Sequence, residues 1–97
     1  MRTLKEVQQW LLQNKPILQE QYKIRELGVF GSYVRGEQTE TSDVDVLVEF
    51  FETPSLLKFT NLENYLSDNL GVKVDLVRRA SLKPQVEKRI LSEVLYL

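Results

Sequence analysis

The sequence predicts a mixed α/β fold of the α+β kind, in which a small mixed sheet of about three or four strands packs against helices. Apolar residues at helical spacing alternate along the chain with short segments that alternate apolar and polar residues. The 97 residues are 42% hydrophobic and 28% charged, a balance typical of a folded globular protein. Since domains commonly have about 100–150 residues, we expect residues 1–97 to form a single domain.

The first helix is predicted to begin at Thr3. Thr3 and Glu6 have the spacing of a capping box, in which each side chain accepts a hydrogen bond from the other residue's backbone N–H. Pro16 would cost a hydrogen bond in the middle of this helix, so we expect a break near residues 14–16. Apolar residues at helical spacing mark the helix itself: Leu4, Val7, Trp10, Leu11 and Leu18.

Three strands are expected. Residues 24–30 are mostly apolar and end at Gly31-Ser32, which indicates a strand that runs into a tight turn. Residues 43–51 form the clearest strand, because three valines alternate with other residues and can face the core together. Residues 72–77 alternate in the same way.

Two more helices complete the predicted order of helix, strand, strand, helix, strand, helix. Thr53-Pro54 resembles a helix start, and apolar side chains then recur at steps of three or four residues until Gly71 ends the helix. The last helix is expected over residues 81–95, with Pro84 in its first turn.

The residue inventory restricts the available chemistry. The chain has no cysteine and no histidine, which excludes disulfides, thiolate nucleophiles, Cys/His zinc sites and imidazole bases. Thirteen basic and fourteen acidic residues give a net charge of −1, so we expect no direct sequence-specific binding of nucleic acid. Neither a signal peptide nor a run of about 20 apolar residues is present, so a cytoplasmic location without membrane contact is expected.

Two neighbouring motifs carry the candidate chemistry. Gly31 lets the end of the first strand approach a phosphate closely, and the Ser32 hydroxyl adds a hydrogen-bond donor. If residues 33–35 make a helical turn, free backbone N–H groups there also face the phosphate. Asp43 and Asp45 follow after ten residues, on one face of their strand, where their oxygens suit magnesium bound to a triphosphate.

Asp75 is the third candidate carboxylate. Val74 and Leu76 flank it, and a charged group between core-forming residues needs a partner. If its strand lies beside residues 43–51, the three carboxylates can hold two magnesium ions about 3.5–4 Å apart, the spacing that serves in-line attack on phosphorus. Each motif also has a plainer interpretation on its own: a common Gly-Ser turn, a solvated Asp-x-Asp strand edge and an exposed aspartate.

Together these motifs resemble the signature of a known family. Gly31-Ser32, ten intervening residues and Asp43-x-Asp45 match the DNA polymerase beta-like nucleotidyltransferase superfamily, and residues 29–37 and 42–50 look like its minimal, MNT-type branch. The match spans essentially the whole chain, and Asp75 matches the third aspartate of the family. The resemblance implies the polymerase beta-like fold and a cytoplasmic enzyme that uses ATP.

The resemblance also implies a partner and residue roles. Members of this branch are similar to antitoxins that transfer AMP from ATP, with magnesium, to a tyrosine of a cognate HEPN-domain ribonuclease toxin, in a heteromeric complex. Two alternatives stay open: a module that neutralises the toxin by occlusion alone, and an enzyme that modifies a small molecule. The implied nucleotide-binding residues are Gly31, Ser32, Asp43 and Asp45, and the implied catalytic and metal-binding residues are Asp43, Asp45 and Asp75.

The sequence does not determine which groups three arginines near these motifs contact. Arg35 is expected to brace its loop by pairing with a carboxylate rather than to contact phosphate. Arg78 and Arg79 follow the last strand and could meet a triphosphate or a partner, although arginines on a turn usually face water.

Overall fold

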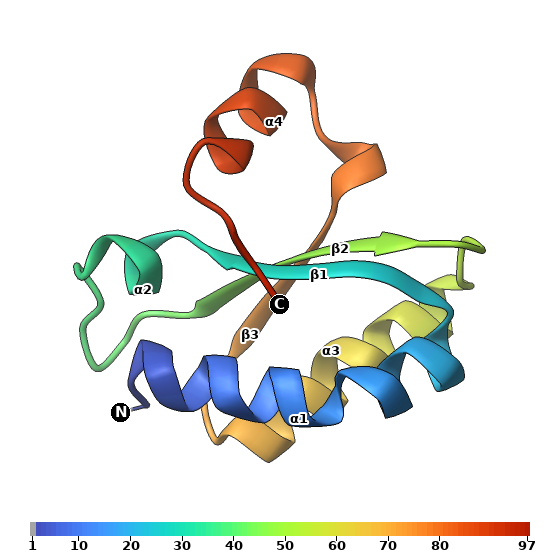
Figure 1. Ribbon diagram of the computed structural model, residues 1–97, viewed down its shortest axis with the longest axis horizontal. Coiled ribbons are helices and arrows are strands. Elements are labelled where there is room, and N and C mark those ends of the chain that lie inside the picture. Colours follow the sequence, from blue (N-terminus) through green and yellow to red (C-terminus); the bar gives the residue numbers. More distant parts are fainter. Residues whose placement is uncertain (1) are drawn as a thin grey trace.

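The computed structural model describes residues 2–97 and places a mixed sheet between two layers of helices (Figure 1). Two long helices cover one face, and a short C-terminal helix stands on the other. This arrangement confirms the predicted fold class. In chain order the elements are α1 (Leu4–Tyr22), β1 (Ile24–Phe30), α2 (Ser32–Arg35), β2 (Val44–Phe50), α3 (Leu56–Leu70), β3 (Val74–Arg78), the short 3₁₀ helix η1 (Arg79–Ser81), α4 (Pro84–Leu91) and β4 (Leu95–Tyr96).

The sheet has four strands in the order β3-β2-β1-β4. β1 runs antiparallel to both β2 and β4, whereas β2 and β3 are parallel and are connected through α3. Phe30 of β1 lies opposite Asp45 of β2, and Asp45 in turn lies opposite Asp75 of β3. The end of β1, which leads into Gly31-Ser32, therefore lies beside Asp45, and Asp45 lies beside Asp75.

The core lies mainly between the sheet and the two long helices. Val44, Val46 and Val48 of β2 are all buried on this side, as the alternation of valines predicts. Leu47 points to the other face and is equally buried, in a second cluster with Ile90 of α4. β2 is thus covered on both faces around its middle, and the second face is open to solvent only towards its ends.

Helix α1 continues through Pro16, so the predicted break near residues 14–16 is wrong. The proline removes the hydrogen bond that its own N–H would have donated to the carbonyl of Leu12, and its ring crowds that carbonyl. Both residues are exposed, so water can satisfy that carbonyl. Leu11 and Leu18 are buried on either side of the proline, and their packing holds both halves in one helix.

The helix ends follow local sequence signals closely. The predicted capping box is present: the Thr3 hydroxyl accepts from the N–H of Glu6 at 3.1 Å, and Glu6 accepts from the N–H of Thr3 at 3.0 Å. α3 begins after Ser55, whose side chain caps it, so the start predicted at residues 53–54 is slightly early. Gly71 ends α3 in the left-handed region, with φ of 68°, as predicted.

The C-terminal segment contains a strand that the sequence pattern did not predict. α4 ends at Leu91 instead of continuing to residue 95, and Leu95–Tyr96 pairs with β1. This pairing satisfies backbone groups that β1 would otherwise leave free at a sheet edge. Gly28 makes the approach possible, because a Cβ at that position would lie 2.7 Å from Cγ2 of Val94. Within residues 2–97, every helix is too short or too polar to span a membrane.

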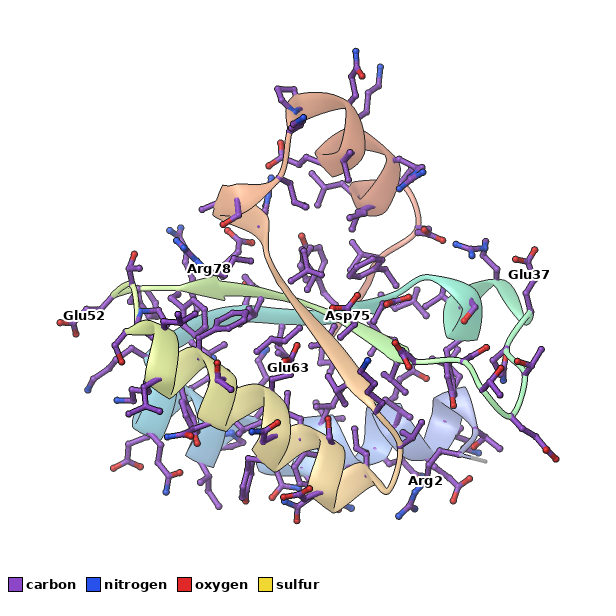
Figure 2. The ribbon with its side chains drawn as sticks, turned by 180° about the vertical axis from the view of Figure 1, so that it is seen from behind. Arg2, Glu37, Glu52, Glu63, Asp75 and Arg78 are labelled. Carbon is purple, nitrogen blue, oxygen red and sulfur yellow. The ribbon has the colours of Figure 1, made fainter. Side chains whose placement is uncertain are left out.

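Helix α3 protects the outer edge of the sheet. The N–H groups of Val74 and Leu76, in β3, donate to the Ser67 hydroxyl at 2.9 Å and to the Glu63 carboxylate at 2.8 Å. Figure 2 shows Glu63 on α3, on the side near β3. These two side chains occupy hydrogen-bonding positions that a further strand would need, so they block pairing at this part of the edge.

Glu63→Ala should therefore lower the free energy of unfolding by about 1.5–3 kcal/mol, the usual contribution of a hydrogen bond to a charged group. The substitution leaves the N–H of Leu76 without its acceptor. Glu63→Gln keeps an acceptor oxygen and should lose less. Urea denaturation of the three proteins measures the difference, and equal stability of Glu63→Ala and the wild type would contradict this role.

Candidate active site

The turn between β1 and α2 carries the first part of the candidate site. Gly31 has φ of 80° and ψ of −153°, a conformation that favours glycine, and its carbonyl accepts from the N–H groups of Val34 and Arg35 at 3.0 and 3.2 Å. The predicted helical turn is present as Ser32–Arg35. The N–H groups of Ser32 and Tyr33 precede the first intrahelical hydrogen bond and can face an anion.

Gly31 is also in contact with the first carboxylate of the site. A Cβ at Gly31 would lie 2.0 Å from Oδ2 of Asp45 and 2.9 Å from its Cγ. The antiparallel register explains the contact, because Phe30 is the partner of Asp45. The glycine therefore leaves room for a protein carboxylate, in addition to the phosphate that the sequence alone suggests.

Three aspartates lie on the same face of β2 and β3. Asp45 and Asp75 are directly opposite each other in the parallel pair, and Asp43 precedes Asp45 by two residues, which returns it to the same face. Asp43 and Asp45 are half-buried, whereas Asp75 is exposed on the outer strand (Figure 2). The structure thus brings together the three carboxylates that the sequence predicts.

The electrostatics of the three aspartates are unfavourable without a cation. The pKa of Asp45 is raised to about 6, mainly by burial and additionally by the negative charges of Asp75 and Asp43. Arg35 acts in the opposite direction, and Lys73 lies 3.9 Å from Asp43. Hard oxygen donors that repel one another suit a divalent metal ion by their chemistry. Within residues 2–97, however, no three acidic side chains are already arranged as a metal-binding group.

A pocket of about 440 Å³ adjoins Asp45 on the β1 side. Its walls include the Gly31 turn, Arg35 and, from the C-terminal region, Arg89 and Glu93. Arg35 donates to Glu37 at 2.9 Å and to both oxygens of Glu93 at 3.0 and 3.2 Å, which confirms the predicted pairing with a carboxylate. Sequence reasoning did not identify Arg89 or Glu93, because neither belongs to a motif and the contact with Arg35 spans most of the chain.

Arg79 does not belong to this pocket. It pairs with Glu49 at 3.1 Å and with Glu87 at 3.4 Å. Glu49 lies four residues beyond Asp45, which is about 13 Å along the strand. Figure 2 shows the neighbouring Arg78 at the opposite end of the sheet from Glu37. Neither arginine is among the residues that line the pocket beside Asp45.

Tyr33 is the one polar side chain of α2 that is buried in the core. It is 2% exposed, and its hydroxyl has no hydrogen-bond partner among residues 2–97. Burial raises its pKa, and the charge of Asp43 adds to the shift. The ring packs in the main hydrophobic cluster and fixes α2 against the sheet, so Tyr33 stabilises the turn that presents Ser32.

A family profile described as a nucleotidyltransferase domain matches residues 12–97, which include the turn, the three aspartates and the pocket. The chain belongs to the nucleotidyltransferase family. It is 55% identical to the protein adenylyltransferase MntA of Thermococcus cleftensis, over 100% of this chain and 98% of the relative.

Solved structures support the same relationship. A protein assigned as a minimal nucleotidyltransferase superposes with a TM-score of 0.76 at 33% identity, over 94% of this chain and 95% of that one. A chain of a toxin-antitoxin structure with AMP-PNP superposes with a TM-score of 0.71 at 25% identity, over 95% of this chain and 69% of that one. The fold of this nucleotidyltransferase is therefore that of the minimal enzymes.

Ser32→Ala should weaken ATP binding by about 2- to 13-fold, since one neutral hydrogen bond contributes about 0.5–1.5 kcal/mol and the backbone N–H groups remain. Titration calorimetry with ATP and magnesium measures this change. Ser81→Ala is a matched control, because Ser81 is exposed and lies after β3, away from the pocket. A complete loss of binding in Ser32→Ala would show that the hydroxyl does more than donate one hydrogen bond.

Proposed function

We propose that this nucleotidyltransferase transfers AMP from ATP to a tyrosine of a HEPN-domain ribonuclease toxin and thereby neutralises it. The observation that carries the proposal is the contact between the Gly31 turn and Asp45, with Asp75 directly opposite on the next strand. The 55% identical relative named as a protein adenylyltransferase supports protein as the acceptor. The similarity to a chain of a toxin-antitoxin structure solved with AMP-PNP supports a toxin as the partner and an adenine nucleotide as the substrate.

The residues of the site match the needs of this reaction. The acceptor oxygen forms a bond to the α-phosphorus while the bond from that phosphorus to the bridging oxygen breaks, so pyrophosphate leaves and the tyrosine proton passes to water. Asp43, Asp45 and Asp75 would hold magnesium, which when bound offsets their charge and polarises the phosphate oxygens. The Gly31 turn and Ser32 hold the triphosphate, and the exposed position of Asp75 leaves the acceptor side open.

The exposed position of Asp75 agrees with a protein acceptor. A small-molecule acceptor would need its own enclosing walls, whereas Asp75 lies exposed on the outermost strand. An acceptor that brings its own folded surface can cover this side.

Mixing the protein with ATP, magnesium and its cognate toxin tests the proposal. Intact mass spectrometry should show that the toxin gains the mass of AMP, peptide mapping should place it on tyrosine, and ribonuclease activity should fall in parallel. The same mixture without ATP is the control. If the toxin is neutralised equally without ATP and stays unmodified, neutralisation is by occlusion and the proposed transfer is wrong.

A further inference from the structure

The pocket beside Asp45 contains two arginines in different electrostatic situations. Arg35 pairs with Glu37 and with both oxygens of Glu93, so its charge is balanced within the protein. Arg89 lines the same pocket from α4, is exposed, and forms no ion pair with any of residues 2–97. Arg89 is therefore the cation of this pocket that can accept an anionic ligand without first losing a partner.

The position of Glu93 explains why Arg89 is free. Glu93 lies four residues after Arg89, a spacing at which the two could pair on a continuous helix. α4 ends at Leu91, however, and Glu93 turns to Arg35, which holds both of its carboxylate oxygens. The pairing of Arg35 with Glu93 thus joins α2 to the C-terminal segment and leaves the guanidinium of Arg89 available at the pocket.

The sheet order sets the side of the site on which the leaving group departs. Asp75, Asp45 and Phe30 lie on the adjacent strands β3, β2 and β1, so Asp45 stands between the exposed edge and the pocket. In an in-line displacement the attacking and leaving oxygens lie on opposite sides of the phosphorus. An acceptor that enters at Asp75 therefore directs the leaving group towards β1 and the pocket wall formed by α4.

We propose that Arg89 binds the β- and γ-phosphates of the nucleotide and holds the pyrophosphate as it leaves, an assignment that rests on the proposed nucleotidyl transfer. A guanidinium suits this role, because it donates two parallel hydrogen bonds to phosphate oxygens and keeps its charge at all physiological pH values. Arg89 also supplies positive charge where three aspartates otherwise face a highly negative ligand.

Nucleotide binding to the isolated protein tests the assignment. Calorimetry with magnesium should show that Arg89→Gln weakens ATP binding by at least about tenfold, because a hydrogen bond to a charged group is lost. Inorganic tripolyphosphate should lose affinity in parallel, whereas AMP, which lacks the β- and γ-phosphates, should bind as to the wild type. Arg89→Lys should recover part of the ATP affinity. Lys88→Gln, a neighbouring exposed residue outside the pocket lining, should bind ATP like the wild type.

Two results would overturn the assignment: ATP affinity unchanged in Arg89→Gln, or an equal loss for AMP and ATP, which would place Arg89 at the nucleoside. Thermal melting of each variant shows whether a loss reflects unfolding, and partial recovery in Arg89→Lys argues against a purely structural role. Transfer to the toxin at saturating ATP is measured separately. If Arg89→Gln transfers normally and binds ATP as tightly as the wild type, the role of Arg89 is wrong and the proposed function is unaffected. If Arg89→Gln binds ATP more weakly but the wild type does not modify the toxin, the proposed acceptor is wrong and the role of Arg89 stands.

Discussion

Asp45→Asn should reduce nucleotidyl transfer by more than about 100-fold and make the metal-free protein more stable at pH 7. Activity falls because Asp45 is the carboxylate that touches the Gly31 turn and faces Asp75. Stability rises because burial and the nearby charges of Asp75 and Asp43 oppose the ionised form of Asp45. Neutral asparagine removes this repulsion, and we expect a gain of about 1–2 kcal/mol after allowance for partial exposure to solvent.

The same substitution should change how stability depends on pH. The pKa of Asp45 is about 6 in the folded protein and near 3.8 in the unfolded chain, so the folded state binds its proton more tightly. The contribution of Asp45 to the wild-type free energy of unfolding is therefore highest below about pH 4. This contribution is lost as the pH rises through 6. Asp45→Asn should lack this decline.

Urea denaturation across this pH range, without added metal and beside an AMP-transfer assay, measures both effects. Asp68→Asn removes a charge from an exposed position on α3 and should alter neither activity nor the decline with pH. An active Asp45→Asn protein would show that the metal-binding interpretation is wrong. A variant that is less stable than the wild type at pH 7 would show that Asp45 is held by favourable contacts instead.

The parts of the site that the sequence predicts are those in which spacing along the chain determines position in space. Asp43 and Asp45 share a face because a strand alternates, and Gly31-Ser32 joins a strand to a helical turn. The valines of β2 lie in the core for the same reason. Placing Asp75 beside these two aspartates required one further assumption, namely that its strand is the neighbour of β2. The parallel pairing of β2 and β3 confirms this assumption.

The parts that sequence did not predict depend on contacts between distant segments. Arg35 and Glu93 are 58 residues apart, so no local pattern joins them or reveals that Arg89 is left unpaired. The C-terminal strand forms because β1 has an open edge, which the helical spacing of the last residues does not show. Pro16 disfavours a helix locally, yet packing on both sides of it outweighs the loss of one solvent-facing hydrogen bond.

Gly31→Ala should abolish transfer, with a loss of at least about 100-fold, while the protein still folds. The new Cβ would overlap Oδ2 of Asp45 at 2.0 Å and crowd its Cγ at 2.9 Å, so the carboxylate must move away from the position that it shares with the turn. The backbone adds a second cost, because φ of 80° with ψ of −153° is a region occupied almost only by glycine, at about 1–3 kcal/mol for other residues.

Gly36→Ala separates these two causes, since Gly36 also has positive φ, at 71°, but no atom lies within 4 Å of the Cβ that it would gain. This control should lose some stability through backbone strain and keep its activity. Gly31→Val, with a larger side chain at the same contact, should be at least as inactive as Gly31→Ala. Thermal melting and AMP transfer are measured for all three variants. If Gly31→Ala were destabilised like Gly36→Ala and remained equally active, the contact between the Gly31 turn and Asp45 would have no part in catalysis.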